Sequence, residues 1–292
     1  MKRVFVTGAS GFLGWNFCRA AVSHFETFGL FGRQLIKIEG VKTLGCDLTD
    51  FHALKKTLAE IEPDAIVHTA ALANPNLCQT QPQTSYRINV EASQNIAGLC
   101  ADRQIPCLYT SSDLVFDGRK PPYVETDPVS PVCIYGEHKV AAEQGIKRCY
   151  PKATICRMAL MFGSSPETAQ SFIQPMLADL ENGRTVNLFV DEFRTPMGVK
   201  TAVAGLMLAL AHPGTTLHLG GDTSLSRHEL GLLTADVLGL SKKNIKACRS
   251  AEIPMAAPRS ADVSLDTTKA RALGFKPIPL ATELQTLKNS TA

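Results

Sequence analysis

Tyrosine and lysine stand four residues apart at Tyr135 and Lys139 of this 292-residue chain. A helix would place both side chains on one face. A tyrosine phenol has a reference pKa of ~10, so it is a poor acid near neutral pH unless a neighbouring cation stabilises the phenolate. Lys139 can supply that charge, and Ser112 can hydrogen-bond the substrate oxygen. The three residues therefore predict proton transfer at a substrate oxygen, with Tyr135 as the donor.

Three glycines, Gly8, Gly11 and Gly14, stand three apart directly after the apolar run at residues 4–7. This order predicts a strand, a tight turn and the start of a helix, which aim backbone N–H groups and the positive end of the helix dipole at one point. A pyrophosphate can bind there. Gly8 permits the turn, Gly11 lets the phosphates approach, and Gly14 lets the helix pack close on the sheet. The alternative is a glycine-rich surface turn. The predicted contacts are Gly8, Ser10, Gly11, Phe12, Leu13 and Gly14.

The end of the next strand, predicted at residues 27–32, carries Arg33. In a dinucleotide site this position meets the adenosine ribose, where an acidic residue would hydrogen-bond the 2′-hydroxyl and favour NAD. A guanidinium suits a 2′-phosphate instead, so the sequence favours NADP (NADPH) over NAD. Two alternatives stay open: Arg33 is simply solvated, or Glu39 is a late acidic substitute.

The G-x-x-G-x-x-G spacing resembles the extended short-chain dehydrogenase/reductases. Residues 111–118, S-S-D-L-V-F-D-G, and residues 131–139 narrow the resemblance to the dTDP-4-dehydrorhamnose reductase family of sugar-nucleotide reductases. The regulatory subunit of methionine adenosyltransferase shares this pattern. The family's active hydroxyl in S-T-D falls on Ser112. Dehydratases of the superfamily carry Asp-Glu after that hydroxyl, and Asp113-Leu114 in this chain disfavours dehydration.

The resemblance implies further contacts. It places Asp47 and Leu48 at the adenine, Ala70 and Ala71 beside the nicotinamide ribose, and Asn89 on a helix behind the cofactor. His68 is expected to be a core histidine with its hydrogen bonds satisfied. The cofactor contacts outside the glycine turn are thus Arg33, Asp47, Leu48, Ala70, Ala71, Asn89, Ser111, Tyr135, Lys139 and Met158, and Ser112 and Asp113 are expected to contact the substrate.

The elements that position these residues predict an α/β fold with a doubly wound parallel sheet, the NAD(P)-binding Rossmann fold, at residues 1–163. Its expected strands include residues 106–109 and 153–158, and the sheet is expected to end near Gly163. Residues 164–292 are expected to form a small substrate lobe. The lobe would contain helices at 172–180, 201–211 and 228–238, extended pieces at 186–189 and 216–219, and a loose tail at 288–292.

Two arginines, Arg194 and Arg259, fall in the predicted lobe. Arginine forks suit a diphosphate, and Arg194 is the first choice because the loop that carries it ends in Pro196. The alternative is an ion pair between Arg194 and Asp191 or Glu192 that only fixes this loop.

Composition excludes several classes of protein. The net charge is +3, from 30 basic and 27 acidic side chains, and no basic block interleaved with aromatics appears, so nucleic acid is not an expected partner. The nine cysteines are irregularly spaced and fit neither a disulfide framework nor a zinc site. We therefore expect no bound metal, and we expect the protein to reside in a reducing cytoplasm. No apolar run reaches membrane-spanning length, so neither a membrane span nor a signal peptide is expected. A homodimer is an open expectation.

Together these patterns predict an NADP-dependent reductase that acts on a keto group of a nucleotide-activated sugar. Three alternatives remain. An NAD-dependent epimerase would use the same three catalytic residues and would show no net oxidation of NADPH. A non-catalytic regulatory subunit would bind NADP and a partner protein without turnover. A dehydratase is the least favoured, because of Leu114.

Overall fold

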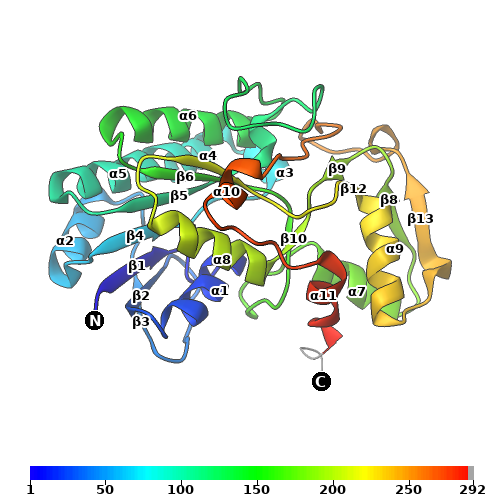
Figure 1. Cartoon of the computed structure of the whole chain (residues 1–292), viewed down its shortest axis with the longest axis horizontal. Helices are drawn as coiled ribbons and strands as arrows, with labels where there is room; N and C mark the ends of the chain where they lie inside the picture. The colour runs from blue at the N-terminus through cyan, green and yellow to red at the C-terminus, as the bar shows by residue number, and fades with distance from the viewer. Residues whose placement is uncertain (289–292) are drawn as a thin grey trace.

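The computed structural model describes residues 1–288, and a seven-stranded parallel sheet lies at its centre (Figure 1). The strand order β11-β6-β5-β4-β1-β2-β3 runs outward in both directions from β1, as in a doubly wound fold. Of the loose tail expected at 288–292, residues 289–292 lie outside the described residues. The strands are β1 Arg3–Thr7, β2 Glu26–Phe31, β3 Val41–Gly45, β4 Ala65–His68, β5 Cys107–Ser112, β6 Thr154–Met158 and β11 Thr216–Leu219.

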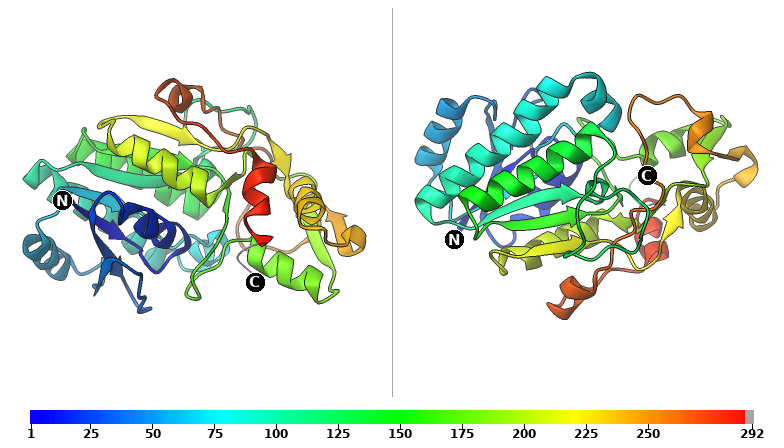
Figure 2. Two further views of the ribbon diagram at one scale, coloured as in Figure 1. Left: turned by 60° about the horizontal axis from the view of Figure 1, so that its bottom comes forward. Right: turned by 90° about the horizontal axis from the view of Figure 1, so that it is seen from above.

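The central strands are buried on both faces, which explains their continuous apolar sequence. Val4, Phe5 and Val6 of β1 are fully buried. Helices α1 (Phe12–Ala21) and α8 (Val199–Leu210) pack in one apolar core, and α2 (Phe51–Ile61), α5 (Ala92–Arg103) and α6 (Ile134–Cys149) pack in the other. Figure 2 shows these helices on opposite sides of the sheet.

Most expected elements lie within a few residues of their predicted bounds. Helix α1 ends at Ala21, whose carbonyl accepts from the N–H groups of both His24 and Phe25. Helix α2 begins after Asp50, whose carboxylate accepts from the Ala53 N–H as an N-cap. Strand β5 continues through Ser112, beyond the predicted 106–109.

The sheet does not end near Gly163, contrary to the prediction. Strand β11 pairs in parallel with β6, and α8 buries Ala202, Leu206 and Ala209 against the sheet. The tetrapeptide of β11 is too short for its sequence alone to place it in a sheet. The buried residues of β11 and α8 complete one face of the sheet. The sheet layer therefore contains residues from both sides of the domain boundary predicted at residue 163. That boundary stays a prediction.

A smaller lobe lies beside the carboxyl edge of the sheet (Figure 1). Helices α7 (Ile173–Glu181) and α11 (Leu280–Gln285) share a separate apolar core with β8 (Val186–Phe189). The other short elements are α3 Pro75–Thr80, α4 Pro82–Tyr86, the π-helical turn η1 Arg87–Glu91, β7 Met161–Phe162, β9 Phe193–Arg194, β10 Met197–Gly198, β12 Leu225–Ser226, α9 Arg227–Leu238, β13 Ile245–Cys248 and α10 Thr268–Ala272.

A carboxylate joins the lobe to the sheet layer. Glu283 of α11 is 3% exposed and accepts from the N–H groups of Gly198 (2.6 Å) and Thr201 (3.0 Å). Those groups lie at the N-terminus of α8, where no side chain of the helix itself caps them. Glu283 therefore acts as the N-cap of a helix more than 80 residues away.

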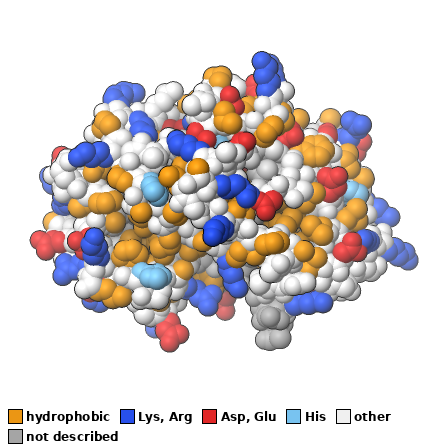
Figure 3. Space-filling model, viewed as in Figure 1, with side chains coloured by type: hydrophobic (Ala, Val, Ile, Leu, Met, Phe, Trp, Pro, Cys, Tyr) orange, Lys and Arg blue, Asp and Glu red, His pale blue; other side chains and the backbone are white. Residues whose placement is uncertain are grey.

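The surface carries both signs of charge. Figure 3 shows Lys and Arg side chains interspersed with Asp, Glu and apolar side chains over the face viewed. Within residues 1–288, no helix combines the length and the apolar character that a membrane crossing would require. The nine cysteines are all free thiols.

Candidate active site

A cavity of about 1080 Å³ runs along the carboxyl edge of the sheet and into the lobe. Doubly wound folds bind ligands at this edge. All the predicted site residues line the cavity except Asn89: Gly8, Ser10, Gly11, Phe12, Leu13, Gly14, Arg33, Asp47, Leu48, Ala70, Ala71, Ser111, Ser112, Asp113, Tyr135, Lys139, Met158 and Arg194.

The glycine turn closes on itself tightly. Gly8 has φ +76°, which favours glycine, and a Cβ there would lie 2.8 Å from the Ala70 backbone. A Cβ on Gly14 would lie 2.2 Å from the Gly8 carbonyl oxygen. Gly14 therefore brings the first turn of α1 against the turn itself and against Thr69. Gly11 caps the helix through its backbone and leaves the space above it to a ligand.

Helix α6 places Tyr135 and Lys139 in its first two turns. Tyr135 is 8% exposed and Lys139 is 2% exposed. The Lys139 ammonium donates to the Thr110 carbonyl at 2.8 Å and lies 5.7 Å from the centroid of the Tyr135 ring. Burial lowers the pKa of Lys139 to about 8. The two side chains share one helix face, as their spacing predicted.

The pKa of Tyr135 differs from expectation. Burial, and after it the carboxyl of Asp113, raise this pKa well above its ordinary value. Lys139 was expected to lower it. The ammonium is instead directed to the Thr110 carbonyl, to which it donates a hydrogen bond. Tyr135 is therefore fully protonated near neutral pH.

Strand β5 ends in three adjacent polar residues. The Ser112 hydroxyl donates to Asp113 Oδ1 at 3.0 Å and accepts from the Leu114 N–H at 3.2 Å. The strand register sets Ser112 beside Met158 of β6. Ser111 Oγ and Asp113 Oδ2 are buried without a hydrogen-bond partner. Asp113 Oδ2 lies 3.4 Å from the Arg194 guanidinium, so Ser111 Oγ is the atom of the two that is available to a bound molecule.

Asn89 lies behind the cavity wall. It is 1% exposed in the π-helical turn η1, where its side chain accepts from the Leu72 N–H (2.8 Å) and donates to the Leu72 carbonyl (3.1 Å). Asn89 therefore holds the loop after β4, whose residues Ala70 and Ala71 line the cavity. Its contact with a cofactor is indirect in this geometry.

His68 is a core histidine with both ring nitrogens bonded, as expected. Its Nδ1 lies 2.6 Å from Thr7 Oγ1 and its Nε2 lies 2.9 Å from Ser93 Oγ, which donates to the Asn89 carbonyl. Burial lowers the pKa of His68 to about 3, so the ring is neutral. The network fixes the ends of β1 and β4 at the cavity.

The lobe end of the cavity contains three arginines and two buried carboxylates. Arg194 is 3% exposed and lies 2.7 Å from Glu192 and 3.4 Å from Asp113 Oδ2. The ion pair with Glu192 is the one that was expected as the alternative to a substrate contact. Arg227 forms a longer ion pair, with its guanidinium 3.9 Å from the Glu192 carboxylate. Arg259 forms no ion pair within residues 1–288. Sequence reasoning missed Arg227, because it reads as the first residue of an ordinary helix.

The opposite end of the cavity is lined by Arg33, Asp47 and Arg87. Asp47 accepts from the Thr49 N–H (2.9 Å) and hydroxyl (2.8 Å), and these bonds lower its pKa with help from Arg87 and Arg33. Arg87 was not predicted. The signal for it was its place two residues before Asn89, on the same turn.

The residues present fit a nicotinamide dinucleotide. The glycine turn offers free backbone N–H groups at the start of α1, the cavity continues from there to Ser112 and Tyr135, and the orphan hydroxyl of Ser111 lies between.

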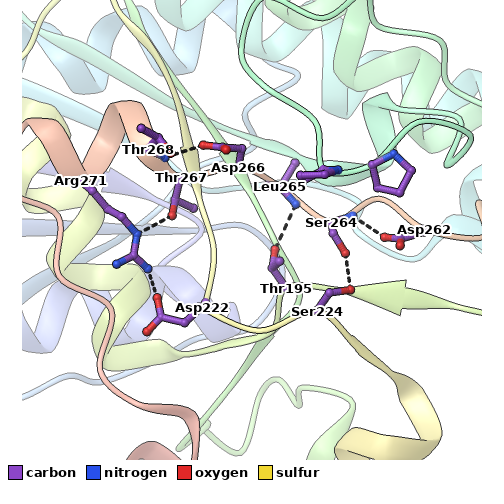
Figure 4. A pocket seen from close by; sticks show the side chains of 13 residues that line it. Thr195, Asp222, Ser224, Asp262, Ser264, Leu265, Asp266, Thr267, Thr268 and Arg271 are labelled. Carbon is purple, nitrogen blue, oxygen red and sulfur yellow. Dashed lines mark hydrogen bonds and ion pairs between the residues drawn. The ribbon is translucent and has the colours of Figure 1, made fainter.

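A second pocket, of about 590 Å³, lies between the lobe and the loop at residues 262–268 (Figure 4). Its polar groups bond to one another. Arg271 forms an ion pair with Asp222 and donates a hydrogen bond to the Thr267 hydroxyl. The hydroxyls of Ser224 and Ser264 are hydrogen-bonded to each other. None of the predicted site residues lines this pocket, and its bonds stabilise the loops around it.

Comparisons with known proteins agree with this architecture. A family model described as RmlD substrate binding domain matches residues 1–291. Methionine adenosyltransferase 2 subunit beta from Mus musculus is 29% identical over 288 residues, which cover 94% of this chain and 83% of the relative.

Two solved structures share the fold closely. A hypothetical dTDP-4-dehydrorhamnose reductase from Sulfolobus tokodaii has a TM-score of 0.84 and 26% identity, and the match covers 95% of this chain and 98% of that one. A dTDP-4-dehydrorhamnose reductase from Bacillus anthracis, in complex with NADP, has a TM-score of 0.84 and 22% identity over 100% of both chains.

Proposed function

Because the chain belongs to the RmlD substrate binding domain family, we propose that it is an NADP-dependent reductase of a keto group on a nucleotide-activated sugar, similar to dTDP-4-dehydrorhamnose reductase. The observation that carries the proposal is the convergence of Ser112, Tyr135 and Lys139 on one cavity with the glycine turn. A protein that only binds a dinucleotide has no need of a buried proton donor beside a buried lysine.

A bound NADPH supplies a hydride to the carbonyl carbon. Tyr135 donates a proton to the carbonyl oxygen, and its raised pKa keeps that proton in place until charge develops on the oxygen. Ser112 holds the oxygen by a hydrogen bond. Lys139 binds the nicotinamide ribose and stabilises the phenolate that remains.

The cofactor is proposed to lie along the predicted contacts. The backbone N–H groups of the glycine turn bind its pyrophosphate, Asp47 and Leu48 meet the adenine, and Ala70 and Ala71 meet the nicotinamide ribose. Arg33 is proposed to face the ribose 2′-phosphate. The Bacillus anthracis structure with NADP supports NADP over NAD.

The substrate is proposed to bind at the lobe end, with its diphosphate on Arg227 and Arg259. Among residues 1–288, these three arginines face two acidic side chains at this end of the cavity, Asp113 and Glu192, so the cluster carries a positive charge that an anion can neutralise. Arg194 is the least available of the three because both carboxylates already engage it. The nine free thiols are consistent with a cytoplasmic setting.

The decisive experiment is a screen of dTDP-, UDP- and GDP-linked keto sugars for oxidation of NADPH at 340 nm by the purified protein. Oxidation with one substrate class, lost in Tyr135→Phe, supports the proposal. Interconversion of sugars without net NADPH oxidation would assign an epimerase instead. The same preparation, measured by size-exclusion chromatography, decides whether the chain is a homodimer.

A second candidate is a non-catalytic regulatory subunit. The observation that favours it is the 29% identity to methionine adenosyltransferase 2 subunit beta. This candidate predicts NADPH binding without turnover of any keto sugar, and a change in the kinetics of a methionine adenosyltransferase catalytic subunit when the chain is added. Tyr135→Phe would leave that effect intact.

A further inference from the structure

Two guanidinium groups line the same end of the cavity without a partner. Arg33 follows β2 and Arg87 opens the π-helical turn η1. Within residues 1–288, neither side chain forms an ion pair or a hydrogen bond. Cations of this kind at a cavity wall are available to an anionic ligand.

The carboxylate of Asp47 interacts electrostatically with both arginines, but its hydrogen bonds are made to Thr49. Its carboxylate accepts from the N–H and the hydroxyl of Thr49, at 2.9 and 2.8 Å, and is more than 4.0 Å from either guanidinium. Arg87 and Arg33 nevertheless both act on it electrostatically. The three charges therefore form one local field at this end of the cavity.

The balance of that field depends on Arg87. With Arg33 alone, the charge of Asp47 would offset the guanidinium, and this end of the cavity would be neutral. Arg87 makes it cationic. A phosphate monoester carries about −1.5 to −2 charges at pH 7, whereas a ribose 2′-hydroxyl carries none. A cationic end of the cavity therefore attracts the 2′-phosphate of NADPH more strongly than the 2′-hydroxyl of NADH.

The backbone holds Arg87 in place. It lies two residues before Asn89, whose side chain is bonded twice to the Leu72 backbone, and the π-helical turn is packed on that contact. Single π turns inside helices occur often at functional sites. Arg87 is thus carried by a fixed segment, although its own side chain is exposed.

We propose that Arg87 and Arg33 together bind the 2′-phosphate of the dinucleotide, and that Arg87 supplies the charge by which the chain selects NADPH over NADH. The assignment rests on the proposed function, which includes NADP binding. The sequence pattern pointed to Arg33, which follows β2. The proposal adds Arg87, a second selectivity residue, from a segment far from β2 in the sequence.

The test compares ligands that differ only in the 2′-phosphate. Adenosine 2′,5′-bisphosphate and 5′-AMP are titrated by calorimetry, and NADPH and NADH by quenching of Trp15, against the parent chain, Arg87→Met, Arg33→Met and the double variant. Methionine keeps the apolar stem and removes the charge. Arg148→Met removes an exposed guanidinium outside the cavity and is the matched control.

The parent is expected to prefer the 2′-phosphorylated member of each pair by at least about tenfold, and Arg87→Met to cut that preference by about tenfold. Affinity for NADH and 5′-AMP should stay within about twofold of the parent. Asp47→Asn, which keeps an acceptor for Thr49, should raise the preference. Higher salt should weaken NADPH binding more than NADH binding, because the added contacts are ionic.

The inference is overturned if Arg87→Met keeps the parent's preference within about twofold, or if the parent shows no preference. Arg148→Met must match the parent in both pairs. If the folded parent binds neither NADPH nor NADH, the proposed function fails, and the bisphosphate and AMP titrations still decide the role of Arg87.

Discussion

Tyr135 retains its proton strongly because it is buried and because Asp113 lies near it. For a group that donates a proton, this is a useful ground state, since the phenol is fully protonated at neutral pH. The cost is weak acidity, which a developing charge on the substrate oxygen and the neighbouring Lys139 must offset. The direction of the pKa therefore favours reduction over oxidation.

Tyr135→Phe should leave NADPH affinity close to that of the parent and lower turnover by about a hundredfold or more, because it removes only the proton donor. Lys139→Met should damage both binding and turnover. Fluorescence titration and steady-state kinetics separate the two effects. Turnover at the parent rate in Tyr135→Phe would refute the mechanism.

Arg194→Ala should lower the free energy of unfolding by about 3–5 kcal/mol, because it leaves the buried carboxylates of Asp113 and Glu192 without their cation. Urea unfolding measures the loss. Arg184→Ala is the control: its ion pair with Asp179 is exposed, so the expected loss is under about 1 kcal/mol. A raised KM for a nucleotide sugar at unchanged stability would instead assign Arg194 to the substrate.

Strand β11 brings a histidine against a buried cation. His218 Nδ1 lies 3.0 Å from the Tyr123 carbonyl, and Nε2 lies 3.4 Å from the Arg157 guanidinium. The carbonyl requires a donor and the guanidinium an acceptor, so the ring is neutral with its proton on Nδ1. Burial, with help from Arg157, lowers the pKa of His218 to about 3.

This pKa makes stability depend on pH. Between pH 6.5 and about 3 the unfolded chain binds a proton at His218 that the folded chain does not, so stability falls as pH falls, by about 1.4 kcal/mol per pH unit for this group. His218→Gln should reduce the slope by that amount in urea unfolding from pH 6.5 to 4. The exposed His52→Gln is the control and should leave the slope unchanged.

Glu283→Ala should destabilise the protein by about 1–3 kcal/mol, because the buried N–H groups of Gly198 and Thr201 at the start of α8 lose their acceptor. Thermal unfolding measures the change. Glu283→Gln, which keeps one acceptor oxygen, should lose less. Gln285→Ala, on the exposed face of the same helix, should cost under about 0.5 kcal/mol. Equal losses in all three would contradict the capping role.

Local pattern sufficed where neighbours in sequence are neighbours in space. The glycine turn and the pair Tyr135 and Lys139 depend on spacings of three or four residues, which a sequence displays directly. The ion pair of Arg194 with Glu192 could be anticipated in this way, but its ion pair with Asp113 could not, because Asp113 is 81 residues away. The lowered pKa of Lys139 and the raised pKa of Tyr135 follow from burial, which no local pattern reports.

The molecule as a whole was predicted as a sheet followed by a lobe, and the chain is less simply ordered. It leaves the sheet after β6, returns with α8 and β11, and leaves again for α9 and the C-terminal helix. The parallel sheet and its order near β1 follow from alternating strands and helices. The return could not be predicted, because pairing of β11 with β6 is decided by tertiary contacts between residues some 60 apart.

Because α8 and β11 join the sheet late in the sequence, the sheet layer stays incomplete for part of the time during which the chain is synthesised. Until α8 and β11 have left the ribosome, the apolar core that contains Val67 and Leu108 lacks the buried side chains that these two elements contribute, such as Leu206 and Leu217. Translation at roughly 5–20 residues per second makes this interval, from residue 163 to 219, about 3–11 seconds long. We expect chains arrested within it to be cleaved rapidly by protease and retained by chaperones, and chains arrested after Glu283 to resist both.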